Sequence, residues 1–300
     1  MPARSPSRPA DPGAPRLHWW KEVLIIGIFY SVYSLVRNQF GSARIDSSGV
    51  ARESFNHALE VIRAERFFGL YREREIQNAF VNHGTFLQFW NVFYGTAHFI
   101  VTVFTFLSIY RYSRHRFVRW RNTLASTTAL ALVGFSLYPL MPPRLLTEGG
   151  PYGGAGFANG VRLAFPIDFI DTLKVYGGPW SFDSGAMTKV SNQFAAMPSL
   201  HCAWSVWCCL ALWPLFRRGW QRAALAAYPI ATMFCIVVTG NHYGLDAIGG
   251  LITLAAGFAL GDGLHRANQR RLARAAEMGA RSAPDDKLAD SASLVDQSAE

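Results

Sequence analysis

Ala196–His201 reads AMPSLH and Gly240–Asp246 reads GNHYGLD, and the rest of the chain is organised around these two stretches. Each stretch joins a polar, turn-forming segment to a long apolar run. Together they place two histidines and one aspartate beside hydrophobic segments. Because ionisable side chains are costly at membrane depth and usually serve a function there, we expect both stretches to form one site at one face of a membrane.

The composition favours a membrane protein over a nucleic-acid-binding protein. Of the 300 residues, 50% are hydrophobic and 16% are charged, and the formal net charge is +9. The positive charges gather between the apolar runs, which is typical of a topology signal and not of a nucleic-acid surface. The four cysteines all lie in apolar segments, so we expect small buried residues and no disulfide framework.

The apolar runs predict an all-α, polytopic membrane protein with six transmembrane helices. The spans are expected near residues 19–37, 86–110, 124–141, 195–216, 223–239 and 245–264, within one membrane catalytic domain covering 17–265. The first run could instead be the apolar part of a cleaved signal peptide. Its aromatic residues Trp19, Trp20, Tyr30 and Tyr33 favour a retained span.

Three further segments differ from the spans. Residues 1–16 are rich in Pro, Arg, Ser and Ala, which predicts a disordered leader, and residues 266–300 are basic and then polar, which predicts a disordered cytoplasmic tail. Residues 41–84 carry a rough apolar stripe between balanced charges. This pattern predicts an amphipathic extracytoplasmic helix on the membrane surface, and a small helical cap is the alternative.

Four basic segments agree with one topology. They precede the first span, follow the sixth, and occupy 111–121 and 217–222. Short basic loops mark the cytoplasmic side, so both termini are expected in the cytoplasm, with 41–84 and 142–194 outside. We therefore expect a multi-pass protein of the cell membrane with an extracytoplasmic active site. The Arg- and Ala-rich composition indicates a bacterial source.

This topology brings the candidate site residues to one boundary of the membrane. The fourth span begins outside at His201, the fifth returns outside at His242, and the third ends near Arg144. Pro198 suits the first turn of a helix, where the following backbone N–H groups of Ser199, Leu200 and His201 have no helical acceptor. Such a terminus binds phosphate, and the guanidinium of Arg144 matches phosphate oxygens. Arg144, Ser199 and Leu200 are therefore the predicted phosphate-binding residues.

His201, His242 and Asp246 are the predicted catalytic residues. His242 and Asp246 are four residues apart, so they share one face of a helix. The carboxylate could accept the Nδ1–H of the imidazole and leave Nε2 basic, which equips His242 to attack phosphorus. His201 would then protonate the leaving oxygen and activate the acceptor.

The other polar residues do not indicate a metal site or a second catalytic group. A zinc site built from His201, His242 and Asp246 is conceivable, but no additional Cys or Glu cluster supports it, and no carboxylate cluster indicates magnesium. We expect neither a metal nor a cofactor. His98 is interpreted as a buried hydrogen-bonding residue. Lys174, Lys189, Arg162 and Asp183 are interpreted as solvated, although one of them could contact a substrate headgroup.

The combined motifs resemble those of the type 2 phosphatidic acid phosphatase superfamily. Pro198-Ser199-Leu200-His201 is similar to its second signature, Pro-Ser-Gly-His. His242-x-x-x-Asp246 is similar to the end of its third signature, and Arg144 stands where the first has its arginine. The residues that flank these motifs resemble most those of the inositol phosphorylceramide synthase-like branch. The resemblance covers about residues 50 to 265.

The resemblance implies the same roles for His242, Asp246 and His201 and a chemistry without metal. The chain also departs from the family pattern. Leu137 stands in place of a lysine, Cys235-Ile236 in place of Ser-Arg, and Leu200 in place of glycine. With two phosphate-binding cations absent, we expect a site suited to a phosphodiester more than to a dianionic monoester.

The sequence therefore predicts an integral-membrane lipid phosphotransferase that acts at the outer membrane face through a phosphohistidine intermediate. Its substrate would be a phospholipid or other lipid phosphate, and the transferred group could be inositol phosphate. One alternative is a lipid or prenyl (di)phosphate phosphatase. A second is a transporter or lipid-binding protein, although such sites usually lie nearer the membrane midplane.

Overall fold

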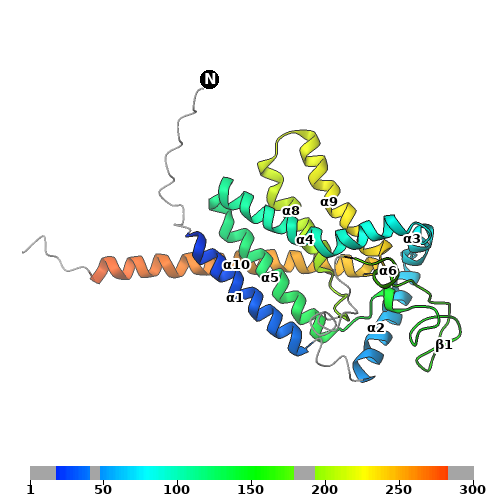
Figure 1. Cartoon of the computed structure of the whole chain (residues 1–300). Coiled ribbons are helices and arrows are strands. Elements are labelled where there is room, and N and C mark those ends of the chain that lie inside the picture. Colours follow the sequence, from blue (N-terminus) through cyan, green and yellow to red (C-terminus); the bar gives the residue numbers. More distant parts are fainter. Residues whose placement is uncertain (1–17, 41–47, 179–192, 283–300) are drawn as a thin grey trace, which may run out of the picture.

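The computed structural model describes residues 18–40, 48–178 and 193–282 (Figure 1). The predicted leader at 1–16, Asp183, Lys189 and the end of the predicted tail at 283–300 lie outside these residues. The longer helices are α1 (Trp19–Phe40), α2 (Ser48–Phe67), α3 (Glu73–Phe80), α4 (Gly84–Tyr112), α5 (Arg114–Leu137), α8 (Leu200–Leu212), α9 (Gly219–Val238) and α10 (Gly244–Ser282). The shorter elements are η2 (Pro143–Leu145), β1 (Phe157–Ala158), β2 (Val161–Arg162), α6 (Thr172–Tyr176) and η3 (Trp213–Leu215).

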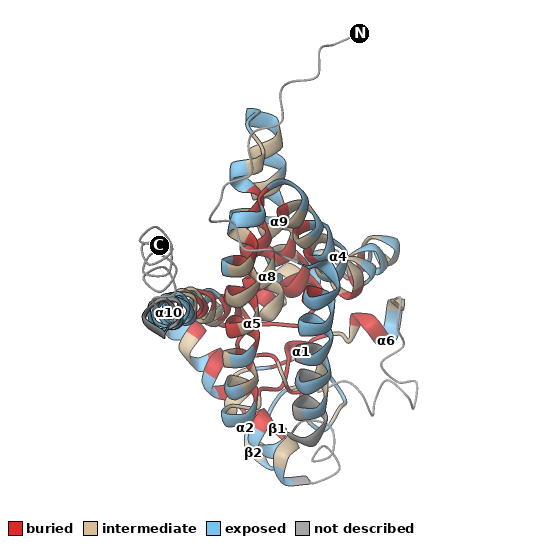
Figure 2. Cartoon of the chain, turned by 90° about the vertical axis from the view of Figure 1, so that its left-hand side faces the viewer, coloured by how far each residue is buried: buried red, intermediate tan, exposed pale blue. Residues whose placement is uncertain are grey.

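The chain is a mostly helical membrane protein. Among the described residues, three helical segments are long and apolar enough to cross a membrane: Gly84–Tyr112, Gly219–Val238 and Gly244–Ala275. A shorter apolar helical segment covers Leu200–Leu215. Large hydrophobic side chains of these helices are exposed, among them Phe99, Ile100 and Ile230, which suits a lipid environment. Figure 2 shows exposed residues along α4 and α9.

Several helix boundaries differ from the sequence-based prediction: the third span was expected near 124–141, but α5 covers Arg114–Leu137, so most of the predicted basic loop at 111–121 is helical. The fourth predicted span was expected to begin at 195, but α8 begins at Leu200 with Ser199 as its N-cap. Pro198 therefore precedes the helix and does not lie in its first turn. At the other end of the chain, α10 runs to Ser282, so residues 266–282 of the predicted disordered tail are helical.

Small residues let α5 and α10 pack closely. Among the described residues, this is the most extensive contact between two helices. A Cβ added at Gly257 would lie 2.0 Å from Thr127 Oγ1, and one added at Gly261 would lie 3.0 Å from Thr123 Cα. Glycines spaced four apart allow helices in membranes to approach at backbone distance. The close approach holds α10, which carries Asp246, against the helix that leads to Arg144.

The amphipathic α2 covers one end of the assembly. Its apolar residues Phe55, Ala58 and Ile62 are buried in a cluster with residues of the long 138–197 connection, which include Leu146 and Ile167. α2, α3, α6 and the β1–β2 hairpin gather at this end, opposite the free end of α10 (Figure 1). The apolar face of α2 is thus used against protein, which favours the helical cap over a helix that lies free on the membrane.

Candidate active site

The turn between α9 and α10 carries His242 and leads directly into Asp246. Gly240 lies in this turn with a φ of +68°, a backbone conformation that favours glycine. A Cβ there would lie 3.3 Å from both the backbone N and the Cβ of Arg144, so glycine also permits close approach of the Arg144 backbone. The Arg144 N–H donates to the Gly240 carbonyl at 2.7 Å, which ties η2 to the turn that carries His242.

Hydrogen bonds define the tautomer of His242. Its Nδ1 lies 2.8 Å from the Ala196 carbonyl oxygen and 3.3 Å from Asp246 Oδ2. A carbonyl and a carboxylate only accept, so Nδ1 must carry the proton. Nε2 then holds a lone pair, and it is buried with no hydrogen-bond partner among the described residues. The predicted pairing of His242 with Asp246 is present, and the Ala196 contact adds a second anchor for the ring.

The side chain of Asp246 is fully buried and accepts hydrogen bonds from two donors. Its Oδ2 accepts the Tyr243 backbone N–H at 2.9 Å in addition to contacting His242. The Ser199 backbone N–H donates to the Asp246 carbonyl at 2.8 Å, so the backbone of the two sequence stretches is directly joined. A Cβ at Gly250 would lie 2.3 Å from the Ser199 carbonyl, which shows how closely α10 and the turn before α8 approach.

His201 lies opposite His242, as the topology argument requires. The two imidazole centroids are 5.6 Å apart and the rings are inclined by 61°. His201 Nε2 is also buried without a hydrogen-bond partner in the described part of the chain. One unpartnered ring nitrogen from the turn before α10 and one from the first turn of α8 thus belong to neighbouring rings, which suits a nucleophile and an acid/base acting on one phosphoryl group.

Two aromatic neighbours of His201 were not assigned to the site from sequence. The Tyr94 ring stacks on His201 with centroids 4.2 Å apart, and the His98 ring lies 4.5 Å from it. His98 Nδ1 is 3.0 Å from the Tyr94 carbonyl, so the hydrogen bond expected for His98 exists. The i, i+4 spacing of Tyr94 and His98 on an otherwise apolar helix was the available signal.

The turn before α8 places Ser199 and Leu200 at the start of that helix. The Ser199 hydroxyl oxygen accepts the Cys202 N–H at 3.5 Å, so it acts as a helix cap. The backbone N–H groups of Leu200 and His201 lie in the first turn, where a helix provides no acceptor. These backbone N–H groups and the imidazole of His201 all belong to the start of α8. A helix N-terminus with free N–H groups is suited to bind an anion.

Arg144 is buried, and its charge is partly compensated. Arg144 Nη1 lies 3.0 Å from Asp171 Oδ2, and Asp171 also caps α6 by accepting the Lys174 N–H. Sequence reasoning did not identify Asp171, because a capping aspartate in a loop carries no distinctive pattern. The side chains of Lys174 and Arg162 are exposed.

The positions that depart from the family pattern contain no cation. Leu137 is highly exposed at the end of α5, and Cys235 is buried with its thiol 3.2 Å from the Trp90 carbonyl. All four cysteines are free, as their apolar surroundings predicted. Among the described residues, no three His, Cys, Asp or Glu side chains are arranged to hold a metal ion.

Residues 59–260 match the family model of the PAP2 superfamily, which is more than half of the chain. The chain therefore belongs to the PAP2 superfamily, as the motifs indicated. This membership supports a membrane-embedded enzyme of the phosphatase type that acts on lipid phosphates. No curated protein and no solved structure matches the chain.

Proposed function

We propose that the protein is a lipid phosphotransferase that moves a phospho-headgroup between lipids through a phosphohistidine on His242. The observation that carries this proposal is the state of His242: Nδ1 faces two acceptors, Nε2 has no hydrogen-bond partner among the described residues, and the ring centroid lies 5.6 Å from that of His201. Such an imidazole is a nucleophile that needs no deprotonation before it attacks.

The reaction has two steps. In the first, His242 Nε2 attacks phosphorus of the donor lipid, a P–N bond forms, and the P–O bond to the lipid alcohol breaks as His201 gives it a proton. In the second, His201 takes the proton of the acceptor hydroxyl, which attacks phosphorus and releases His242. Asp246 stabilises the positive charge on the phosphorylated ring, and the α8 terminus with Arg144 stabilises the oxygens.

Transfer of a phosphodiester is favoured over hydrolysis of a monoester by the charge of the site. Arg144 is paired with Asp171, and Leu137 and Ile236 stand where the family signatures have a lysine and an arginine. A phosphodiester carries one negative charge, whereas a monoester carries up to two near neutral pH. A site with one partly compensated arginine therefore suits a diester, including one with an inositol phosphate headgroup. Hydrolysis remains the second candidate, because family membership supports a phosphatase-type enzyme.

The proposed topology has six spans with both termini in the cytoplasm. Its support is the position of the basic segments, at 111–121 and 217–222 and at the two ends of the membrane domain. The active site then lies at the extracytoplasmic face, where α8 begins and α9 ends. No metal takes part in the proposed steps.

His242→Ala tests the proposal directly. Purified wild-type protein should convert a headgroup-labelled phospholipid and an acceptor alcohol into a new phosphodiester, and should carry a label that is stable to alkali and lost in acid. His242→Ala should lose at least about 10²-fold in turnover and all of the label. The exposed His115 provides the matched control, and His115→Ala should retain both. Full activity in His242→Ala would overturn the proposal, and release of free phosphate alone would support the phosphatase.

A further inference from the structure

Two buried glutamates from the extracytoplasmic cap reach the start of α10. Glu65 of α2 is 0% exposed and Glu73 of α3 is 2% exposed. Glu73 Oε1 accepts the Gly244 N–H and Glu65 Oε1 accepts the Leu245 N–H, each at 2.8 Å. The free N–H groups of the first turn of α10 are thus bound by side chains that are 171 and 180 residues distant in sequence.

The two carboxyl groups lie close to each other as well as to the helix. A Cβ added at Gly244 would lie 3.3 Å from Glu73 Oε1 and 3.4 Å from Glu65 Oε1. Glu73 Oε2 accepts the Arg72 N–H at 3.0 Å, whereas Glu65 Oε2 is buried with no hydrogen-bond partner among the described residues. Two adjacent buried carboxyl groups do not both ionise readily, and the oxygen without a donor is the one that keeps a proton.

We propose that Glu65 and Glu73 are positioning residues that hold the His242–Asp246 turn, and that this pair keeps one proton, on Glu65. The inference rests on the proposed function of His242 and Asp246. The clamp acts where the turn enters α10, immediately between His242 and Asp246. It therefore controls the distance from His242 Nδ1 to Asp246 Oδ2, which makes His242 nucleophilic.

Loss of the proton from Glu65 would add a buried negative charge near Asp246. The ionisable groups that face Glu65 are Glu73 from α3, Tyr71 from the preceding loop, and Asp246 and Tyr243 from α10 and its entry turn. The nearby arginines are engaged elsewhere, Arg66 over the Phe165 ring and Arg74 with Asp168. Burial and then the charge of Glu73 raise the pKa of Glu65 from 4.5 to about 8.

The sign of the pH effect follows from that raised pKa. Folded protein keeps a proton on Glu65 that unfolded protein loses above pH 4.5, so Glu65 reduces stability progressively from about pH 4.5 to about pH 8. Above about pH 8 the folded protein also loses this proton, and the clamp then carries an extra charge beside Asp246. Activity should therefore fall above about pH 8.

Glu65→Gln tests whether ionisation of Glu65 causes the fall in activity, because a glutamine side chain has the shape of a protonated carboxyl group and does not ionise. The glutamine amide accepts from Leu245 and donates as a protonated carboxyl does. The measurement is kcat/KM from pH 6 to 9.5. Near pH 7 the kcat/KM of this variant should be within about threefold of the wild-type value, and above about pH 8 it should not decrease as the wild-type value does. Glu65→Ala should lose about tenfold or more at every pH. Glu75→Gln, at an exposed site on the same helix as Glu73, should match wild type throughout.

The proposal would be overturned if kcat/KM of Glu65→Gln decreased at alkaline pH as in wild type, or if Glu65→Ala were fully active. The melting temperature gives a readout independent of the chemistry. It should fall between pH 6 and pH 8 in wild type and fall less in Glu65→Gln. If His242→Ala keeps its activity while this difference in melting persists, the proposed function fails and the clamp stands.

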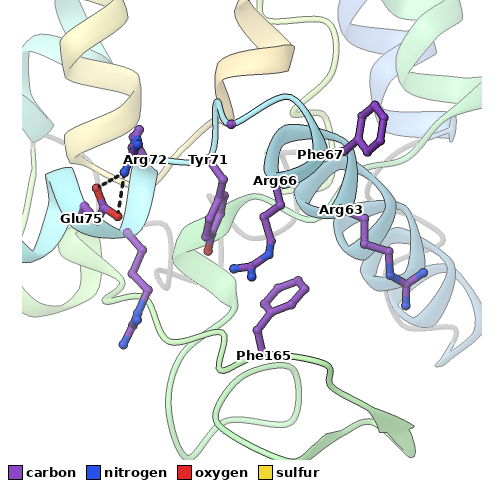
Figure 3. Close-up of a pocket in the computed structure, with 9 residues that line it drawn as sticks. Arg63, Arg66, Phe67, Tyr71, Arg72, Glu75 and Phe165 are labelled. Carbon is purple, nitrogen blue, oxygen red and sulfur yellow. Dashed lines mark hydrogen bonds and ion pairs between the residues drawn. The ribbon is translucent and has the colours of Figure 1, made fainter.

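An independent observation concerns a hollow on the outer side of the same cap. It has a volume of about 560 Å³ and is lined by Arg63, Arg66, Arg72 and Arg74, with Tyr71 and Phe165 among the other walls (Figure 3). Arg72 pairs with Glu75, and Arg74 pairs with Asp168. Among the described residues, no acidic partner lies within ion-pair distance of Arg63 or Arg66, so the hollow retains positive charge.

Exposed apolar side chains stand at the rim of this hollow. Phe67 is 84% exposed and Phe68 is 67% exposed, directly after Arg66. Aromatic side chains beside arginines are typical of segments that enter the membrane interface, and the volume is of the size that holds a headgroup. We infer that the hollow binds the headgroup of an anionic phospholipid in the membrane around the enzyme.

Native mass spectrometry of protein released from nanodiscs tests this inference. Wild type from discs of phosphatidylcholine with phosphatidylglycerol should retain phosphatidylglycerol selectively. The double variant Arg63→Ala/Arg66→Ala should retain at least about fivefold less, and Arg111→Ala/Arg114→Ala should retain as much as wild type. Equal retention in both double variants, or equal retention of the neutral lipid, would overturn it. Displacement of the lipid by millimolar inorganic phosphate would show a site for free phosphate and would also overturn it.

Discussion

Arg144 and Asp171 form a buried ion pair that sets how much positive charge the candidate site offers to phosphate. Their 3.0 Å contact holds one edge of the guanidinium, and Asp171 also caps α6. The arginine was predicted from its place in the first signature. Its partner was not, because the two residues are 27 positions apart in a segment without a periodic pattern, and only folding brings them together.

Asp171→Asn should change substrate preference. Asparagine caps helices about as well as aspartate, so α6 should be preserved. Loss of the Asp171 carboxylate removes one negative charge beside Arg144, so a dianionic substrate should be favoured, and the ratio of monoester hydrolysis to phosphodiester transfer should rise about fivefold, the equivalent of about 1 kcal/mol. The measurement is kcat/KM for a lipid phosphomonoester and a glycerophospholipid on the same preparation. An unchanged ratio would show that Asp171 does not limit the charge available to substrate.

Helix α10 carries Asp246 of the candidate site in its first turn and packs closely against α5 further along. The apolar pattern predicted a helix there, beginning near 245, and α10 begins at Gly244. For α8 the start was wrong by five residues, because the apolar composition of 195–199 hides a turn that hydrogen bonds to α10. Composition locates a helix, but a capping contact determines where it starts.

Gly257→Ala should destabilise the α5–α10 contact. The added methyl group would lie 2.0 Å from Thr127 Oγ1 and 2.9 Å from the Thr127 backbone N, so a helix must shift. We expect a loss of about 1–3 kcal/mol, measured as a lower melting temperature in detergent. Gly263→Ala, on the same helix with nothing within 4 Å of the new Cβ, should be neutral or slightly stabilising. Equal melting temperatures for the two variants would contradict close packing at Gly257.

The whole molecule places its cap and the turn between α9 and α10 toward one end and the free end of α10 toward the other (Figure 1). If the proposed topology holds, Phe157 in β1 faces the outside, and His115 and Arg217 face the cytoplasm. In a background without the four native cysteines, Phe157→Cys should react with a membrane-impermeant maleimide in intact cells. His115→Cys and Arg217→Cys should react only after the membrane is opened. Labelling of all three in intact cells would contradict the six-span arrangement.

Local patterns of the chain were enough to predict an all-α membrane protein, the family, and the residues around His201, His242 and Asp246. Those features depend on hydrophobic runs and short motifs, which act between near neighbours in sequence. The lone pair on His242 Nε2 depends on the Ala196 carbonyl, and the pairing of Arg144 depends on Asp171. The Glu65–Glu73 clamp likewise reaches Gly244 from helices far earlier in the chain. Contacts over such separations form only when the helices pack, so the tertiary structure alone decided how the site is charged and held.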